Sequence, residues 1–330
     1  MTDKIVLTGI KPTGMPHMGN YIGALKSMIA ASETQKTIMF IADLHALNTI
    51  YDPKTIREHT YQAAAIIMAL GIDLDNTILF RQSDIDEIYQ LNTLLMNVTP
   101  KGLMNRAHSY KAAMDKNAAN GADTDSGINM GLYTYPILMS ADILLYNADI
   151  VPVGADQKQH VEFARDIAGH FNTIYGTTFK MPEPVIGQDT GLIPGLDGRK
   201  MSKSYDNTIP LMASEKELKK KVMRIITDSK TPEEPKEPED STIFQLYKHF
   251  ATPAEIAEFA EMFRRGGMGY GTAKTILFEK INSSLAKARD EYERLMANRH
   301  EIDAVLARGA ESARKIAQHT MARVKKAMLG

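Results

Sequence analysis

A glycine- and proline-containing turn near the start of the chain has the residue types of a phosphate site. The stretch GIKPTGMPHMGNY (residues 9–21) follows a short apolar run and leads into a helical pattern that begins near Gly19. Backbone N–H groups and the positive end of a helix attract phosphate at such a turn. His17 could donate to phosphate oxygens, and capping of the helix would explain it equally. Because neither the Walker pattern nor G-x-G-x-x-G is present, a purely structural turn stays an alternative.

A second candidate is the string KMSKS at residues 200–204, inside an irregular stretch that covers residues 187–204. Lys200 and Lys203 stand three positions apart with Ser202 between them. Flexible ammonium groups can follow negative charge as it develops on a leaving pyrophosphate. An exposed basic loop would explain two lysines at this spacing, whereas the complete five-residue string is much more specific.

One predicted helix carries a carboxylate among apolar and aromatic side chains. Tyr135, Met139, Asp142 and Tyr146 are spaced i, i+4, i+7 and i+11, so they share a helix face. A carboxylate in this setting needs a partner, and a group of the protein itself is the ordinary one. A substrate donor is the other explanation, because an indole N–H only donates and an aspartate accepts. A phenol hydroxyl donates too, so the residues alone do not choose between them.

The elements that must position these residues alternate between strands and helices. Strand-like runs cover residues 5–8, 37–42, 77–80 and 150–153, and helical patterns cover residues 19–31, 56–70, a segment after Asp84, and 157–171. This alternation predicts an α/β fold with a Rossmann-like, doubly wound parallel sheet. Such sheets bind ligands at the carboxyl ends of their strands, near the point where the strand order reverses. We therefore expect the site just after these runs.

The last third of the chain has an almost entirely helical pattern. We expect residues 1–210 to form a Rossmann-like catalytic domain and residues 211–330 a helical domain, whose last helix could pack back on the first. Residues 117–129 are polar and are predicted to be a mobile loop. Residues 229–240 carry a proline at every third position and are predicted to be an extended, solvated linker. Gly309 interrupts a helical pattern, which indicates close packing or a helix break.

Composition excludes several kinds of site. The 330 residues include no cysteine, so disulfides, thiolate metal sites and cysteine nucleophiles are excluded. The net charge is -1, and any contact with RNA must therefore come from local patches. We find neither a signal peptide nor an apolar run near the roughly 20 residues of a membrane helix, so we expect a cytoplasmic protein without a membrane.

The His-x-Gly-Asn motif at residues 17–20 and the downstream KMSKS string together resemble the signature pair of class I aminoacyl-tRNA synthetases. Residues 135–146 and the run DIVPVGADQKQH at residues 149–160 are similar to the tryptophanyl-tRNA synthetase family. The related tyrosine enzymes usually carry glutamine where Met139 stands. The similarity runs along most of the chain and weakens in the C-terminal helices.

This resemblance implies a reaction, cofactors and partners. The carboxylate of L-tryptophan would attack the α-phosphorus of ATP to give tryptophanyl-adenylate and pyrophosphate, and tryptophan would then pass to the 3′ end of tRNA(Trp). Positioning and charge stabilisation would dominate the first step. The implied cofactors are ATP and Mg²⁺, with the ion held mainly by ATP phosphates rather than by a protein metal site. The helical domain would bind the anticodon, and the protein would be a homodimer.

The resemblance also implies roles for individual residues. The catalytic residues would be His17, Lys200, Ser202 and Lys203, with Lys111, or less strongly Lys116, as a contact for pyrophosphate. ATP would be bound by Lys11, Pro12, Thr13, Gly19, Asn20, Gly154, Ala155, Asp156, Leu192, Lys200, Met201, Ser202, Lys203 and Ser204. Tryptophan would be bound by Asp142 at the indole nitrogen, by Tyr135 and Gln157 at the amino group, and by Leu7, His45, Met139, Val151 and Val153 around the ring. Asp156 could equally be a helix N-cap.

Other functions fit parts of the pattern. A tyrosyl-tRNA synthetase would share the reaction class, but Met139 and residues 149–160 argue against it. A pantothenate synthetase or a cytidylyltransferase would share the motifs without the pocket helix and the helical third. A non-catalytic paralogue that binds tryptophan or RNA would not turn over ATP, and the intact His17, Lys200 and Lys203 argue against that.

Overall fold

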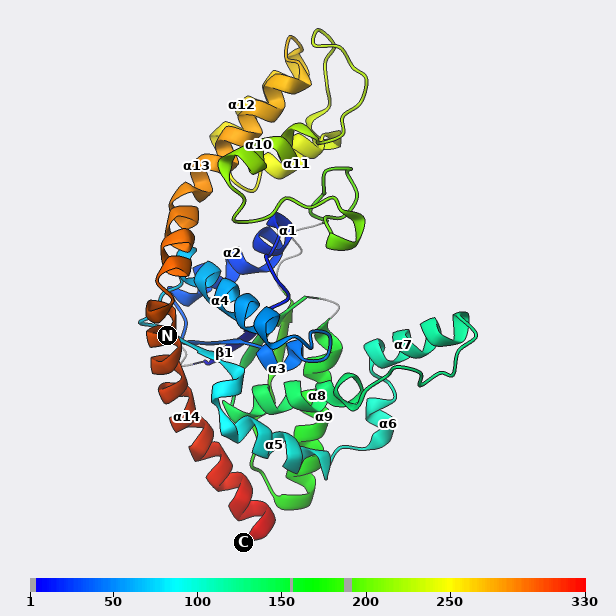
Figure 1. Cartoon of the computed structure of the whole chain (residues 1–330), viewed down its shortest axis with the longest axis vertical. Helices are drawn as coiled ribbons and strands as arrows, with labels where there is room; N and C mark the ends of the chain where they lie inside the picture. Colours follow the sequence, from blue (N-terminus) through cyan, green and yellow to red (C-terminus); the bar gives the residue numbers. More distant parts are fainter. Residues whose placement is uncertain (1–3, 155–156, 187–191) are drawn as a thin grey trace.

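The computed structural model describes residues 4–154, 157–186 and 192–330. An α/β domain fills the middle of the molecule, and a lobe of helices stands above it (Figure 1). The lobe contains α10 (Glu215–Met223), α11 (Thr242–Tyr247) and α12 (Pro253–Arg265). The long helices α13 (Tyr270–Ala297) and α14 (Arg299–Leu329) run from the lobe down along the α/β domain. The predicted α/β fold with a helical C-terminal part is confirmed.

The described residues form a five-stranded parallel sheet in the order β3-β2-β1-β4-β5. The strands are β1 (Val6–Ile10), β2 (Thr37–Ile41), β3 (Thr77–Arg81), β4 (Ile150–Val153) and β5 (Glu183–Ile186). The chain moves outward from β1 to β3 and then returns to add β4 on the other side of β1. The reversal therefore lies between β1 and β4, which is where a ligand site is expected in such a sheet. The strand β5 was not predicted, because its largely exposed sequence EPVI lacks an apolar run.

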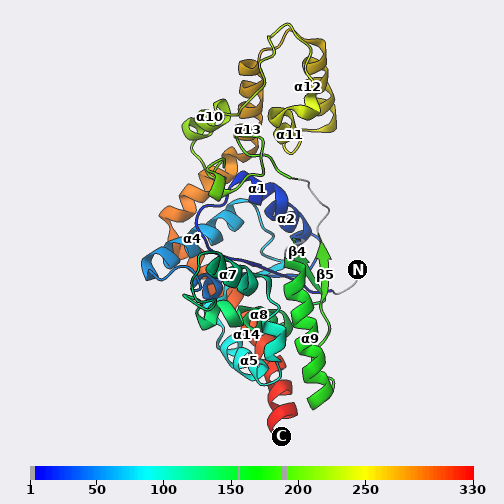
Figure 2. The same cartoon turned by 90° about the vertical axis from the view of Figure 1, so that its right-hand side faces the viewer.

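Helices cover both faces of the sheet, as Figure 2 shows from the side. Met39, Ile41 and Leu79 point into a core with α4 (Pro53–Ala69) on one face. Phe40 and Phe80 point into a larger core on the other face. That core includes side chains of α5 (Asp86–Met96), α8 (Met130–Leu145) and α9 (Lys158–Tyr175). Within the part of the chain that the structure describes, none of the helices has the length and apolarity to cross a membrane.

Helix α14 crosses the edge strand β3 at Gly309. A Cβ atom added to Gly309 would lie 1.8 Å from the carbonyl oxygen of Leu79, so only glycine permits this approach. Leu306 joins the core on one face of the sheet and Ala310 joins the core on the other, so the helix straddles the edge of β3. The predicted close packing at Gly309 is confirmed, and the helix continues unbroken.

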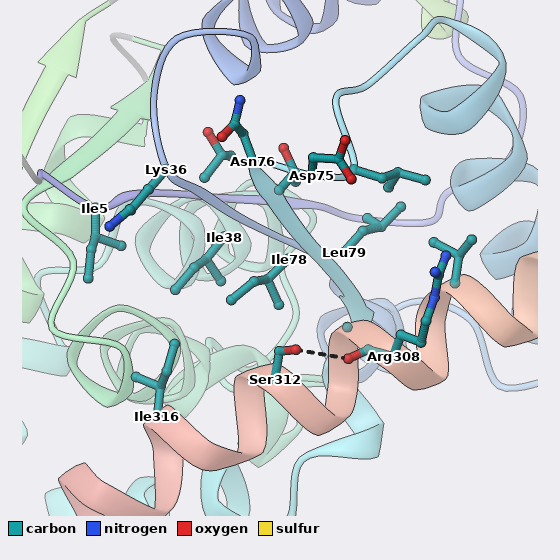
Figure 3. Close-up of a pocket in the computed structure, with 15 residues that line it drawn as sticks. Ile5, Lys36, Ile38, Asp75, Asn76, Ile78, Leu79, Arg308, Ser312 and Ile316 are labelled. Carbon is teal, nitrogen blue, oxygen red and sulfur yellow. Dashed lines mark hydrogen bonds between the residues drawn. The ribbon is translucent and has the colours of Figure 1, made fainter. Parts of the chain in front are cut away.

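A cavity of about 460 Å³ lies beside this crossing (Figure 3). It is bounded by the amino ends of β1, β2 and β3 and by Ser312 and Ile316 of α14. Ser312 donates to the carbonyl oxygen of Arg308 at 3.1 Å and thus faces its own helix. Because ligands of such sheets bind at the carboxyl ends of the strands, this cavity is at the wrong end to be the active site.

The prediction of an extended, solvated linker at residues 229–240 is wrong only about its shape, because the segment is largely exposed but folds back on itself. Lys236 is buried there, and its ammonium group donates to the carbonyl oxygens of Thr231, Pro232 and Glu234 at 2.7, 3.3 and 2.8 Å. The segment therefore closes around a cation instead of extending into solvent. Proline removes backbone donors without removing carbonyl acceptors, which explains how a proline-rich segment can bind an ammonium group.

The predicted loop at residues 117–129 is partly helical. Helix α7 (His108–Ala119) runs into it, preceded by the short α6 (Lys101–Met104). The side-chain amide of Asn117 donates to the carbonyl oxygens of Thr124 and Ser126 at 2.9 and 2.8 Å, which folds the following turn back on the helix. The polar composition of the segment obscured the helix, because α7 has no strong apolar face.

Candidate active site

The turn after β1 ends at a capped helix start. His17 is the N-cap of α1 (Met18–Asn20), which continues through the π-helical η1 (Tyr21–Leu25) into α2 (Lys26–Ser32). The Nδ1 atom of His17 accepts from the backbone N–H of Asn20 at 3.3 Å, and Oδ1 of Asn20 accepts from the backbone N–H of His17 at 3.0 Å. The capping role is therefore present. Because Nδ1 serves the cap, a contact of His17 with phosphate would have to use Nε2.

The KMSKS string lies directly against this turn. The thioether of Met201 accepts from the backbone N–H of Gly19 at 3.2 Å, and Nζ of Lys203 donates to the carbonyl oxygen of Thr13 at 3.2 Å. Burial, and then the charge of Lys203, lowers the pKa of His17, so its imidazole is neutral at pH 7. The structure thus joins two motifs that are about 180 positions apart in the sequence, as the prediction requires.

Asn207 organises the KMSKS loop and was not among the predicted residues. Its side chain is 2% exposed. Its Oδ1 accepts from the backbone N–H of Ser202 at 2.8 Å, and its Nδ2 donates to the carbonyl oxygen of Lys200 at 3.0 Å and to Asp197 at 2.7 Å. One buried amide therefore fixes the backbone on both sides of Met201. Ser202 also caps the short helix η4 (Lys203–Tyr205) by accepting from Ser204.

We predict that Asn207→Ala slows adenylate formation, the reaction that the resemblance implies, about 10-fold, because the backbone on which Lys200 and Lys203 depend loses its hydrogen bonds. The single-turnover rate at saturating substrates measures this effect. The melting temperature separates it from general unfolding, since most of the fold does not depend on this loop. An unchanged rate in a folded variant would show that the loop keeps its working shape without Asn207.

Asp142 lies at the centre of a buried network. Its side chain on α8 is 1% exposed. Nε2 of His45 lies 2.9 Å from Oδ2, and Nε2 of Gln82 donates to Oδ1 at 2.8 Å and to Oδ2 at 2.9 Å. Burial raises the pKa of Asp142, and the hydrogen bonds from His45 and Gln82 oppose the rise. Partners within the protein are thus present, and a carboxylate oxygen that accepts one bond still has room for another donor.

The partners of Asp142 follow two neighbouring strands. His45 belongs to α3 (Asp43–Ala46) just after β2, and Gln82 opens the 3₁₀ helix η2 (Gln82–Asp84) just after β3. His45 was predicted as a pocket residue, and Gln82 was not. Because both elements follow the carboxyl ends of their strands, they lie where the fold predicts a ligand site.

Tyr135 and its surroundings form the next part of the pocket. The hydroxyl of Tyr135 accepts from Ser109 at 2.8 Å and forms a short hydrogen bond with the ring of His160. Its ring meets that of His45 edge-on, with centroids 6.4 Å apart. The other predicted ring contacts border the same core: Leu7 and Val151 are buried in it, and Met139 and Val153 are partly buried against it. His160 was not predicted as a site residue, although it lies in the motif at residues 149–160.

Several other predicted residues lie at exposed positions or outside the described residues. Lys111 is exposed on α7, which projects to the side of the domain (Figure 1), and that helix reaches the pocket through Ser109 instead. Leu192 is 69% exposed. Gly154 and Gln157 are both exposed after β4, where the backbone N–H of Gln157 donates to the carbonyl oxygen of Gly154 at 2.9 Å. Ala155 and Asp156 lie outside the described residues.

Comparison with known proteins identifies the family. The family model for tRNA synthetases class I (W and Y) matches residues 2–286. The chain belongs to this family. It is 49% identical to a tryptophan–tRNA ligase of Neisseria meningitidis over 331 residues, which covers 99% of this chain and 98% of that protein. A tryptophan–tRNA ligase of Pseudomonas aeruginosa is 47% identical over 99% of this chain and 74% of its own length.

A solved structure supports the same family. The crystal structure of tryptophanyl-tRNA synthetase from Campylobacter jejuni, complexed with ADP and tryptophan, matches this fold with a TM-score of 0.90. The two chains are 42% identical, and the match covers 98% of each. The predicted family and the predicted class of enzyme are confirmed.

Proposed function

We propose that this chain is a tryptophan–tRNA ligase that forms the adenylate where the turn at residues 11–20 meets the KMSKS loop. The main supporting observation is the contact between Lys203 and Thr13, which places an ammonium group on the turn that leads into a helix start suited to phosphate. The tryptophan pocket would centre on Asp142, and both parts lie at the carboxyl ends of the parallel strands.

In the first step, the carboxylate of tryptophan attacks the α-phosphorus of ATP as the bond to the leaving pyrophosphate breaks. No proton has to move, so the work of the protein is positioning and charge stabilisation. The Nε2–H of His17 would hold phosphate oxygens, and the N–H groups of Gly19 and Asn20 would do so only by exchanging their contacts with Met201 and His17. Lys200 and Lys203 would follow the negative charge onto pyrophosphate, and Lys203 would exchange its contact with Thr13 for that one.

The remaining nucleotide contacts are proposed on resemblance. Besides those already placed on phosphate, the ATP-binding set is Lys11, Pro12, Thr13, Gly154, Ala155, Asp156, Leu192, Met201, Ser202 and Ser204, with Lys111 toward pyrophosphate. Burial lowers the pKa of Lys11, so its ammonium group would gain from a phosphate partner. The described residues contain no group of three or more acidic or histidine side chains able to hold a metal ion. A Mg²⁺ ion that arrives with ATP would be held mainly by phosphate oxygens, where it would neutralise charge.

The amino acid would be bound from both of its ends. Oδ1 of Asp142 would accept the indole N–H, and Tyr135 and Gln157 would hold the amino group. Leu7, Met139, Val151 and Val153 would surround the ring, with His45 beside it. A pocket built around one hydrogen-bond acceptor strongly rejects analogues that lack the donor, since the buried acceptor would stay unpaired.

In the second step, a ribose hydroxyl at the 3′ end of tRNA(Trp) attacks the acyl carbon, and AMP leaves. The helical lobe would contact the anticodon by shape and base edges. Arg224, Arg264, Arg265, Lys274 and Lys287 remain candidates, although Lys274 donates to the carbonyl oxygen of Met223 at 3.1 Å. We also propose, on resemblance, that the protein acts in the cytoplasm as a homodimer.

We expect amino-acid-dependent exchange of pyrophosphate into ATP with tryptophan alone among the twenty amino acids. The assay tests adenylate chemistry and amino-acid choice together, without tRNA. Exchange with tyrosine instead would show that the chain is a tyrosyl-tRNA synthetase. Exchange with no amino acid would favour a non-catalytic paralogue, and charging of tRNA(Trp) is the second assay that completes the assignment.

A further inference from the structure

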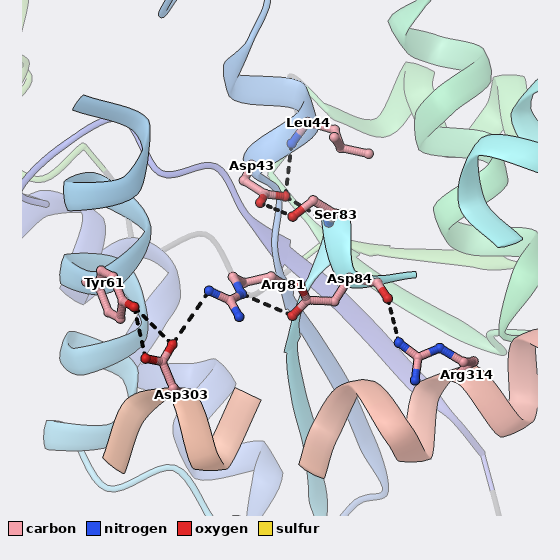
Figure 4. A network of polar contacts seen from close by, with 8 residues as sticks. All are labelled: Asp43, Leu44, Tyr61, Arg81, Ser83, Asp84, Asp303 and Arg314. Carbon is pink, nitrogen blue, oxygen red and sulfur yellow. Dashed lines mark hydrogen bonds and ion pairs between the residues drawn. The ribbon is translucent and has the colours of Figure 1, made fainter. Parts of the chain in front are cut away.

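The two elements that hold Asp142 are braced to each other by Asp43. Its Oδ1 accepts from the backbone N–H groups of Ser83 and Leu44 at 3.0 and 3.1 Å, and its Oδ2 accepts from the hydroxyl of Ser83 at 2.5 Å (Figure 4). Asp43 is in α3 with His45, and Ser83 is in η2 with Gln82. The brace therefore fixes the separation of the two groups that bind the Asp142 carboxylate.

The same brace orients the amide of Gln82. The N–H of Leu44 also points to Oε1 of Gln82, at 3.2 Å. Because Oε1 accepts there, the NH₂ group must be the end that faces Asp142, which agrees with its donation to both carboxylate oxygens. A reversed amide would place an oxygen against the carboxylate and leave two acceptors facing each other.

The C-terminal helix α14 anchors η2 from its far side. Arg314 donates through Nη2 to the carbonyl oxygen of Asp84 at 2.8 Å. The side chain of Asp84 accepts from Nε of Arg81 at 3.0 Å, and Arg81 lies 3.6 Å from Asp303 of α14. Tyr61 donates to Asp303 at 3.0 Å (Figure 4). Helix η2 is thus held at Ser83 by Asp43 and at Asp84 by a helix more than 200 positions further along the chain.

We propose that Arg314 is a positioning residue for tryptophan recognition, acting with Asp43 through η2 on the Asp142 carboxylate. This proposal rests on the proposed role of Asp142 at the indole nitrogen. With η2 held at Ser83 and Asp84, Gln82 and His45 contact the carboxylate from the protein side, and Oδ1, which accepts from Gln82, can accept the indole N–H as a second donor. When Arg314 is lost, η2 can shift, and Gln82 no longer fixes the Asp142 carboxylate. The oxygen that would accept the indole N–H is then no longer held in its orientation.

A purely structural anchor behaves differently from a positioning residue. It would weaken every ligand equally or lower stability without changing selectivity. Arg323 provides the matched control, because it lies on the same helix and donates to Oδ1 of Asn147 at 2.9 Å, outside the brace. Arg314→Ala and Arg323→Ala therefore each remove one arginine hydrogen bond from α14. Only Arg314→Ala removes a bond to η2.

The test measures dissociation constants of the full-length chain for tryptophan and for the analogue in which sulfur replaces the indole N–H, together with the KM for ATP. We expect Arg314→Ala to weaken tryptophan about 10-fold while the analogue and ATP change less than about twofold. Arg314→Lys should restore part of the loss, since an ammonium group can also donate to the Asp84 carbonyl oxygen. Arg323→Ala should change nothing. Equal weakening of tryptophan and the analogue would overturn the proposal.

A double-mutant cycle with Asp142→Asn separates this inference from the proposed function. If Arg314 acts through Asp142, Arg314→Ala adds no further loss of tryptophan affinity in the Asp142→Asn background. Additive losses would overturn the role of Arg314 while leaving that of Asp142 intact. If Asp142→Asn itself leaves the preference for tryptophan over the analogue unchanged, the role of Asp142 fails first. Should Arg314→Ala not fold, Ser83→Ala replaces it, because it removes a donor to Asp43 from the same short helix.

Discussion

Lys203→Ala should slow the formation of tryptophanyl-adenylate about 100- to 1,000-fold, while the dissociation constant for tryptophan changes less than about twofold. The Lys203 ammonium group lies on the turn of the proposed phosphate site, at 3.2 Å from the Thr13 carbonyl oxygen. The groups around Asp142 come from α3, η2 and α8 instead. The charge of Lys203 is thus available to the leaving pyrophosphate and not to the ring of the amino acid.

Rapid-quench measurements of a single turnover give the rate of this step. Because the chain contains no tryptophan of its own, the fluorescence of the bound substrate can report the dissociation constant without that background. Lys315→Ala is the control, since this lysine is 72% exposed on α14 and pairs only with Glu311 among its described contacts. A normal rate in Lys203→Ala would remove Lys203 from the mechanism.

Asp142→Asn should lower kcat/KM for tryptophan about 100-fold and leave the KM for ATP nearly unchanged, because the amide keeps only one acceptor oxygen where the carboxylate offers two. Gln82 donates to both carboxylate oxygens. An asparagine amide would therefore place its NH₂ group against a donor in either orientation, and the network would have to rearrange. The change conserves volume, so packing in the core is not the cause of the loss.

The ratio of kcat/KM for tryptophan to that for phenylalanine and tyrosine measures the selectivity directly. We expect this ratio to fall in Asp142→Asn and to stay constant in Asp290→Asn, which removes an exposed carboxylate on α13. Unchanged discrimination against the other aromatic amino acids would show that Asp142 is a structural residue, held only by its partners in the protein.

Much of the fold could be predicted from local patterns. Apolar runs marked β1 to β4, because strands buried on both faces need continuous apolar sequence. The edge strand β5 was not predicted for the opposite reason, since the largely exposed sequence EPVI matches no burial pattern. The proline-rich segment around Lys236 was misjudged, because its composition says nothing about the carbonyl oxygens that bind the ammonium group.

Site residues could be predicted where they belong to a recognisable motif or share a helix face. The two nucleotide motifs meet as expected, and Tyr135 and Asp142 lie on one helix beside His45. The supporting residues could not be found in this way. Gln82 is 60 positions from Asp142, and Arg314 is 230 positions from Asp84. Contacts at such separations depend on how strands and helices are stacked, and no local spacing encodes them. The catalytic and binding roles predicted for the site residues, Lys111, Leu192, Ala155 and Asp156 included, stay predictions.

Edge strands with unpaired backbone groups recruit strands of other chains and so promote aggregation. Helix α14 covers that edge of β3, because it straddles the strand and packs into the cores on both faces. The cover lies so close that any side chain at Gly309 would collide with the backbone of Leu79. The close cover of this strand edge therefore depends on a single glycine.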